Sequence, residues 1–336
     1  MAPVISVFNN KGGVGKTTYL FHIAHLLAGQ DKTILLVDLD SQCNLSTYCL
    51  KDKALTAAWA EDGNSIYRVV EPIYRGLGDF KQLMPISFNA IYPTLYLTPG
   101  DIALSNFEDR LGDSWNAARG GSEPDIRVQS ALHRYIRWAS DAIGADLVLV
   151  DLGPNLGALN RAVLGSSDYF IIPMSPDLFS IRGTENLGNK LLNWNDGWQQ
   201  CREAWETRGN GDIDIPTGAP KFVGYVKQQH NIRNNVAGMT KGWQIFGNQV
   251  EGAIQRNIID KLSTRGQVFE WGKDDLNWHL GNIPNLHSLV PYSLKAKKPV
   301  FDCTGRDGLV GSHVTKARKS RSHYEGIVNR ILQVVG

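Results

Sequence analysis

Several features that would assign a chain to a particular class of protein are absent from this 336-residue sequence. No apolar run approaches the roughly 18 to 20 residues that a membrane-spanning helix needs. The four cysteines form no C-x-x-C pair, which argues against a zinc site and indicates free thiols in a reducing compartment. There is no internal repeat and no low-complexity linker, and we expect no signal peptide because an apolar run already begins at Val4. We therefore expect a single cytoplasmic domain.

Charge is nearly balanced overall, with 35 basic residues against 33 acidic ones, but it is unevenly distributed. Residues 290–336 hold nine Lys or Arg and three acids, a net charge of +6, so the rest of the chain carries −4. With 42% hydrophobic and 20% charged residues, the composition is ordinary for a globular protein with a core. The basic C-terminal segment therefore predicts an anionic surface as a partner.

The first thirty residues contain a strand, a glycine-rich turn and a helix in immediate succession. Residues 4–8 form a short apolar run that predicts a buried strand, and residues 9–15 hold three glycines that predict a turn. From Thr17 onward, apolar residues recur at the spacing of one helical face. Such a turn directs backbone N–H groups and the positive end of the helix toward an anion, so this stretch predicts a phosphate cradle. In it, Lys16 would reach the β- and γ-phosphates and the Thr17 hydroxyl would ligate Mg²⁺.

The turn departs from the usual G-x-x-x-x-G-K-[ST] pattern, whose first glycine would stand where this chain has Asn10. A second lysine opens the turn instead, and the full run is Lys11, Gly12, Gly13, Val14, Gly15, Lys16, Thr17 and Thr18. This run resembles the deviant Walker A motif of the ParA/MinD family of ATPases. The resemblance implies that these eight residues bind ATP, and that Lys11 reaches the phosphates held by a second subunit.

Two further apolar runs end in carboxylates. Residues 32–40 end in Asp38 and Asp40, and residues 146–154 contain Asp151. The strands at 4–8 and 32–40 with the helix between them form a right-handed βαβ unit, in which ligands bind beyond the carboxyl ends of the strands. An apolar strand that ends in Asp is typical of a Walker B motif, whose carboxylate holds the Mg²⁺ shell through water. A capping role is the alternative for Asp151, and a structural role is the alternative for Asp38.

The resemblance extends to both of these runs. Residues 37–46 resemble the family motif V-D-x-D-P-Q-G-N-x-S, with Ser41 in place of Pro and Cys43 in place of Gly. The family's assignments then make Asp40 the residue that orients the attacking water, with Lys11 and Lys16 as the other catalytic residues. The metal site would comprise Thr17, Asp38 and Asp151.

Such a site has no strong base, so hydrolysis of ATP should be slow. For contacts to the adenine ring, the sequence offers three candidates from loops near the expected nucleotide end: Lys227, Gln228 and Pro284.

The remaining segments also predict an α/β fold. Short apolar runs at 95–100, 169–173 and 222–226 predict further strands, and residues 130–143 and 322–335 predict helices. Glycines predict a mobile loop at 112–124, and Pro284 predicts a loop that begins at 283. We expect a mostly parallel twisted sheet with helices on both faces, in one P-loop ATPase domain spanning 1–336. Helical insertions fall at about 51–135 and 229–281, and the basic C-terminal segment is 290–336.

Taken as a member of this family, the chain would be a ParA-like ATPase that forms a sandwich dimer with Mg-ATP. The dimer would bind DNA non-specifically, act in partition of a plasmid, chromosome or other cargo, and be reset by slow hydrolysis that a partner protein stimulates. It would then associate with the nucleoid. The residues expected to contact DNA phosphates are Lys295, Lys297, Lys298, Lys316, Arg318, Lys319 and Arg321. No helix-turn-helix precedes the glycine-rich turn, so we do not expect recognition of a specific operator.

Four alternatives stay open from the sequence. Residues 316–321 fit a solvated helix face equally well. A MinD-like membrane-associated ATPase would need an amphipathic helix at 324–335, but this stretch holds one Arg and no Phe or Trp, which favours a helix packed on the core. A metabolic relative of the same fold is disfavoured by the absence of suitably placed cysteines and by Lys11. A partner-dependent regulatory ATPase that does not bind DNA fits the large insertions.

Overall fold

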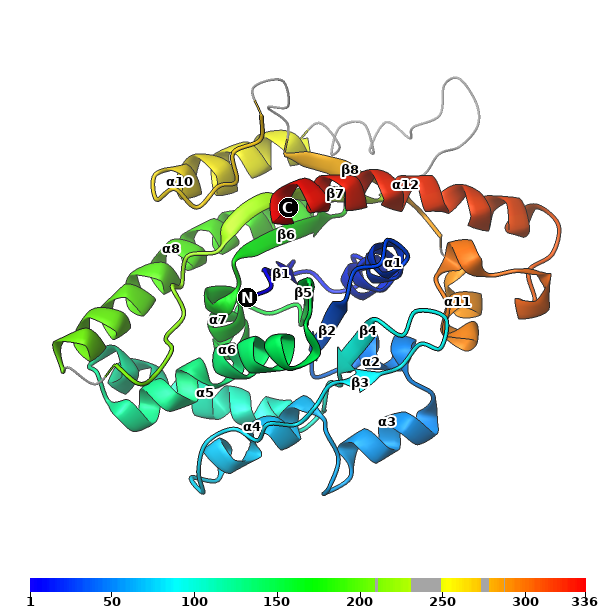
Figure 1. The fold of residues 1–336 in the computed structure, drawn as a ribbon. Coiled ribbons are helices and arrows are strands. Elements are labelled where there is room, and N and C mark those ends of the chain that lie inside the picture. The colour runs from blue at the N-terminus through cyan, green and yellow to red at the C-terminus, as the bar shows by residue number, and fades with distance from the viewer. Residues whose placement is uncertain (209–210, 231–248, 273–277, 287) are drawn as a thin grey trace.

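One sheet runs through the molecule and carries helices on both of its faces (Figure 1). The computed structural model describes residues 1–208, 211–230, 249–272, 278–286 and 288–336. Within these residues eight strands pair in the order β3-β4-β2-β5-β1-β6-β7-β8, and every neighbouring pair is parallel except β3 with β4. The strands are β1 (Val4–Val7), β2 (Ile34–Leu39), β3 (Ile86–Ser87), β4 (Leu95–Thr98), β5 (Leu147–Leu152), β6 (Tyr169–Met174), β7 (Lys221–His230) and β8 (His279–Pro284). The predicted α/β class is confirmed.

Helices on one face come from the middle of the chain, and those on the other come from its two ends. The first face carries α4 (Ile66–Tyr74), α5 (Leu104–Arg119), α6 (Glu123–Ile143), α7 (Ala158–Ser166), α8 (Leu178–Thr207), the π-helix η1 (Gln255–Ile259) and α10 (Asp260–Ser263). The second face carries α1 (Lys16–Ala28), α2 (Asn44–Cys49), α3 (Asp52–Trp59), α11 (Val290–Ala296) and α12 (Ser312–Val335).

The central strands are apolar on both faces because helices cover both. In β5, Val148 and Val150 belong to the core beneath α4–α8, while Leu147 and Leu149 belong to the core beneath α1 and α12. This is the period-2 alternation of a strand whose two faces are both buried. It explains why the central strands could be located from apolar runs alone.

The predicted mobile loop at 112–124 is wrong. Residues 104–119 form α5 and α6 begins at Glu123, so only three residues separate the two helices. Within α5, Leu104, Phe107 and Leu111 are fully buried at helical spacing. Their burial outweighs the roughly 1 kcal/mol that Gly112 costs inside a helix.

Two other predicted boundaries change. Residues 283–284 do not begin a loop but end β8, where Pro284 is tolerated because β8 is an edge strand that stops there. The closing helix predicted at 322–335 exists and begins ten residues earlier, as α12. Much of the predicted insertion at 229–281 lies outside the described residues, at 231–248 and 273–277, so its helical character stays a prediction.

The C-terminal segment is attached to the helix that follows the glycine-rich turn. His22 of α1 donates from Nδ1 to Thr18 O (2.6 Å) and accepts at Nε2 from the backbone N–H of Val300 (2.9 Å), and its ring stacks on Tyr324 of α12. Burial lowers the pKa of His22 to about 3, so the ring stays neutral and its acceptor nitrogen stays available.

The apolar face of α12 is covered. Ile327, Val328 and Ile331 are fully buried against the sheet, as the packed-helix interpretation predicts. Among the described residues, none of the helices combines the length and the apolar character needed to cross a bilayer.

Candidate functional site: the glycine-rich turn and its carboxylates

The turn after β1 has the backbone conformation of a phosphate cradle. Gly13 and Gly15 have φ values of 72° and 83°, which place both in the left-handed region, and α1 starts at the next residue, Lys16. Because side chains with a Cβ are strained in this region, the glycines are needed to turn the loop onto the helix N-terminus. The helix then presents its first N–H groups to the space above the turn.

Lys16 points back into its own loop. Its side chain is 6% exposed, and its ammonium donates to the carbonyls of Asn9 (3.2 Å) and Lys11 (3.3 Å). Burial lowers the pKa of Lys16, while Asp151 and Asp40 oppose that shift. A phosphate at the turn would supply a further counter-charge and favour the ammonium form.

Asp38 and Asp151 lie side by side on neighbouring strands, as register partners of β2 and β5. The Thr17 hydroxyl donates to Asp151 Oδ2 (2.6 Å), while Asp151 Oδ1 is buried without a partner. Asp38 Oδ2 instead accepts from the backbone N–H (2.8 Å) and the hydroxyl (2.6 Å) of Ser46. Asp38 therefore holds the segment after β2 in place, which agrees with the structural alternative for this residue.

These contacts fit a magnesium ion held by few protein ligands. Among the described residues there is no cluster of three or more His, Cys, Asp or Glu side chains that would hold a metal alone. Thr17, with the orphan oxygen of Asp151 behind it, matches an ion that takes its other ligands from phosphate and water. The predicted metal residues are thus brought together.

Burial of these carboxyl groups in a small volume raises their pKa values. Desolvation is the largest cause for both, and it raises the pKa of Asp151 to about 8 and that of Asp38 to about 6. Asp38 and Asp40 reinforce the shift at Asp151, whereas Lys16 and Thr17 oppose it. The nucleotide-free chain therefore carries a protonated Asp151 at neutral pH.

This protonation predicts a pH dependence of stability that Asp151→Asn removes. Between the unfolded pKa of 3.8 and the folded pKa of about 8, the folded chain binds one more proton, so raising the pH destabilises it. The slope is up to about 1.4 kcal/mol per pH unit. The buried His22 and His25, with lowered pKa values, oppose it only below their unfolded pKa of 6.5.

The measurement is urea unfolding of nucleotide-free, EDTA-treated protein at pH 6.5 and pH 8. We expect the free energy of unfolding to fall by about 2 kcal/mol more in the wild type than in Asp151→Asn. The exposed Asp113→Asn serves as the control and should behave as wild type. Equal slopes in wild type and Asp151→Asn would show that Asp151 is ionised in the folded chain.

A cavity of about 400 Å³ opens above the turn. It is lined by Gly12, Gly13, Val14, Gly15, Lys16, Thr17, Thr18, Asp40, Gln42, Asn44, Thr47, Tyr48, Pro154 and Leu294. Asp40 is 6% exposed and accepts from the backbone N–H of Gln42 (3.0 Å), and a Cβ on Gly153 would lie 3.4 Å from its Oδ1. Asp40 therefore lines the same cavity as the glycine-rich turn.

A second hollow of about 280 Å³ continues from the turn toward the C-terminal segment. Gln228 and Pro284, two of the adenine candidates, line it, and Gln228 Nε2 donates to Gly15 O (3.3 Å). The third, Lys227, does not line it; its ammonium lies 5.9 Å from the centre of the Tyr225 ring. The sequence reasoning missed the other lining residues, among them Asn285, Leu286 and Tyr324.

The Lys11 side chain points away from the cavity that Lys16 lines. It is not among the lining residues, and its ammonium bonds Asp177 Oδ2 at 2.6 Å, just before α8. Both side chains of this ion pair are about one-third exposed. The two lysines of the turn therefore point to different places.

The residues predicted to bind DNA fall into two groups. Lys298 is paired with Asp307 (3.0 Å), Arg321 with Glu325 (2.7 Å), and the ammonium of Lys297 donates to Thr47 O. The other four side chains are exposed: Lys295 on α11, and Lys316, Arg318 and Lys319 on α12.

The sequence itself matches a family model. A model described as an AAA domain covers residues 2–199, which is more than half of the chain. The chain belongs to the ParA-type P-loop ATPase family. The members of this family are ATPases.

Named relatives of this ParA-type chain include partition proteins. The sporulation initiation inhibitor protein Soj of Bacillus subtilis is 27% identical over 191 residues, which are 57% of this chain and 65% of Soj. The chromosome partitioning protein ParA of Caulobacter vibrioides is 28% identical over 189 residues, which are 55% and 60% of the two chains. The chain spans about half to two thirds of the length of the curated relatives it matches.

Solved structures share the ParA-type fold. Protein DIP2308 of Corynebacterium diphtheriae superposes with a TM-score of 0.68 at 25% identity, covering 88% of this chain and 97% of its own. A complex of McdA from Cyanothece with ATP gives 0.64 at 13% identity over 98% and 96%. ParA of pNOB8 bound to nonspecific DNA gives 0.56 at 17% identity over 99% of each chain. The last two likenesses concern the fold alone.

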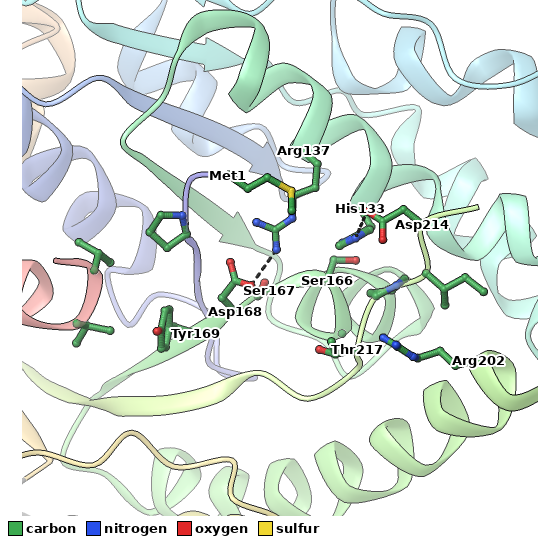
Figure 2. A pocket seen from close by; sticks show the side chains of 16 residues that line it. Met1, His133, Arg137, Ser166, Ser167, Asp168, Tyr169, Arg202, Asp214 and Thr217 are labelled. Carbon is green, nitrogen blue, oxygen red and sulfur yellow. Dashed lines mark hydrogen bonds and ion pairs between the residues drawn. The ribbon is translucent and has the colours of Figure 1, made fainter. Parts of the chain in front are cut away.

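A larger hollow of about 490 Å³ lies beside the amino ends of the central strands of the ParA-type sheet (Figure 2). Its walls include Pro3 and Asp168, which precede β1 and β6, so it is remote from the carboxyl ends of these strands. Arg137 forms an ion pair there with Asp168 (2.9 Å), and His133 Nε2 lies 3.1 Å from Asp214 Oδ2. Parallel sheets bind nucleotides at the carboxyl ends of their strands, which lie at the opposite end of the sheet from this hollow.

Proposed function

We propose that this chain is a ParA-like ATPase that works as a Mg-ATP-dependent dimerisation switch. The observation that carries the proposal is the divergence of the two lysines in one P-loop. Lys16 is buried in its own loop, whereas Lys11 leaves its own cavity and stays partly exposed. An ammonium placed outside its own phosphate site suits a role toward phosphates held by a second copy.

Hydrolysis in such a site depends on positioning and charge. Lys16 and the N–H groups at the start of α1 would hold the phosphates, and Mg²⁺ at Thr17 would neutralise charge on their oxygens. Asp40 lines the same cavity and would orient the attacking water rather than deprotonate it, because carboxylates in general are weak bases and its Oδ1 already accepts a hydrogen bond from the loop. Slow turnover follows, and a partner protein that stimulates it would set the lifetime of the dimer.

The exposed cations of α11 and α12 support non-specific DNA as the anionic partner. Lys295, Lys316, Arg318 and Lys319 are free to contact phosphates, while the ion pairs of Lys298 and Arg321 make them weaker candidates. Contacts of this kind are insensitive to sequence and weaken steeply with salt. The chain would then act on the nucleoid, in partition of a plasmid, chromosome or other cargo, as one domain spanning 1–336.

The test is binding to a random-sequence DNA duplex with ATP, with ADP and without nucleotide, at two salt concentrations. Binding that needs ATP and falls steeply with salt supports the proposal. Absence of binding under all conditions would contradict it and favour a partner-dependent regulator that does not act on DNA.

Neutralising the exposed cations of α12 is expected to weaken DNA binding. Replacing Lys316, Arg318 and Lys319 together by Gln should flatten the slope of log affinity against log salt by about 1 to 3, because each phosphate contact contributes close to one. The measurement is a salt titration of the ATP-bound form. A matched control replaces three exposed lysines elsewhere, Lys51, Lys53 and Lys81, and should keep the wild-type slope. An unchanged slope in the α12 variant would assign these residues to a solvated helix face.

A further inference from the structure

The ion pair between Lys11 and Asp177 joins two segments that are 166 residues apart. Asp177 Oδ2 accepts from the Lys11 ammonium (2.6 Å) and from the Ser180 hydroxyl (3.2 Å). Asp177 Oδ1 accepts from the backbone N–H groups of Phe179 and Ser180, at 3.0 Å each. One carboxylate therefore both caps the N-terminus of α8 and holds the second lysine of the P-loop.

Other contacts hold the end of β6 and the second turn of α8 close to the same loop. Asn9 Nδ2 donates to Pro173 O at 2.6 Å, at the end of β6. A Cβ on Gly183 would lie 2.2 Å from Asn10 Oδ1, so a larger residue there would displace the Asn10 side chain. The first turns of α8 and the P-loop thus form one packed unit.

Two large apolar side chains beside this unit are exposed to solvent. Leu178 is 51% exposed and Phe179 is 77% exposed, although they directly follow the residue that binds Lys11. In a dimer with two-fold symmetry the same patch is used by both copies. If Lys11 reaches across to phosphates of a second copy, its neighbours in the first turn of α8 come close to that copy too.

We propose that the first turn of α8 is a docking surface for a second copy of this chain, closed by a latch between Lys11 and Asp177. This rests on the proposed function. In the free chain Asp177 holds the Lys11 ammonium away from its own phosphate site. When a second copy docks, Lys11 exchanges Asp177 for the partner-bound phosphates, and Leu178 and Phe179 become covered.

Asp177→Asn separates the latch from the helix cap. Asparagine caps helices as well as aspartate does but lacks the charge that binds Lys11. In the wild type the dimer forms only when the ion pair between Lys11 and Asp177 breaks in both copies. A partly exposed ion pair contributes little free energy, so we expect the variant, which lacks both pairs, to form the ATP-dependent dimer about 2- to 30-fold more tightly. The matched control is Asp113→Asn, which removes an exposed acid of α5 and should leave dimerisation unchanged.

Phe179→Ser tests the docking surface. Its side chain makes little contact in the free chain, so thermal stability of the monomer should be unchanged, while the ATP-dependent dimer should weaken at least about tenfold. Leu77→Ser, which removes a 75% exposed side chain after α4, is the control for surface hydrophobicity. A Phe179→Ser dimer as tight as wild type would overturn the docking surface.

A second readout tests the latch without any dimer. An amine-reactive label, followed by mass spectrometry on nucleotide-free protein, should modify Lys11 more slowly in the wild type than in Asp177→Asn. Equal labelling, or an Asp177→Asn dimer no tighter than wild type, would overturn the latch. A wild type that stays monomeric with ATP would instead overturn the proposed function and the docking surface with it, whatever the labelling shows.

Discussion

Lys11→Ala is expected to abolish ATP-dependent dimerisation while leaving ATP binding by the single chain within about twofold of wild type. The reason is that Lys11 lies outside its own cavity, so its removal takes nothing from the phosphates bound in the same chain. In the dimer, by contrast, each missing ammonium leaves phosphate charge unpaired at a buried interface, which typically costs several kcal/mol.

Light scattering after size-exclusion chromatography with Mg²⁺ and a non-hydrolysable ATP analogue measures the dimer, and fluorescence titration measures nucleotide affinity. Lys53→Ala is the control, because Lys53 is an exposed lysine of α3 remote from the P-loop in sequence. A dimer in the Lys11→Ala variant as stable as wild type would contradict the sandwich arrangement.

Lys16→Ala is expected to have the opposite profile, with ATP binding by the single chain itself weakened. The Lys16 ammonium is buried at the base of the cavity, within bonding distance of two loop carbonyls and flanked by Asp151 and Asp40. Its charge-assisted bonds to phosphate are worth about 1.5 to 3 kcal/mol, so the affinity for ATP should fall about 10- to 150-fold. Calorimetric titration measures the loss.

The Lys11→Ala variant is the internal control for this measurement, since it removes the same chemical group five positions earlier in the turn. If both variants lose ATP binding equally, the assignment of Lys16 to phosphates in its own chain and of Lys11 to phosphates in a second copy is wrong. Circular dichroism at the temperatures used establishes that Lys16→Ala is folded.

The central sheet and the phosphate side of the site were predictable because their signals are local. Strands β1, β2 and β5 are short apolar runs, and the glycines and lysines of the P-loop follow one another in a single turn. The register of β2 with β5 then brings Asp38 beside Asp151, as expected for carboxylates that end parallel strands.

The features that could not be predicted depend on contacts between distant segments. The α5 helix contains a glycine that resembled a loop signal, and only its buried apolar face shows why the helix persists. The hollow of about 280 Å³ combines the P-loop with β7, the end of β8 and α12, so no single stretch contains it. The partner of Lys11 lies 166 positions away, and no spacing rule points to Asp177.

The measurement that tests the account most directly is the mass of the wild-type chain in solution, at one protein concentration, with Mg²⁺ and non-hydrolysable ATP, with ADP, and without nucleotide. We predict a dimer with the ATP analogue and a monomer in the other two conditions. A monomer in all three conditions, or a dimer indifferent to nucleotide, would contradict it.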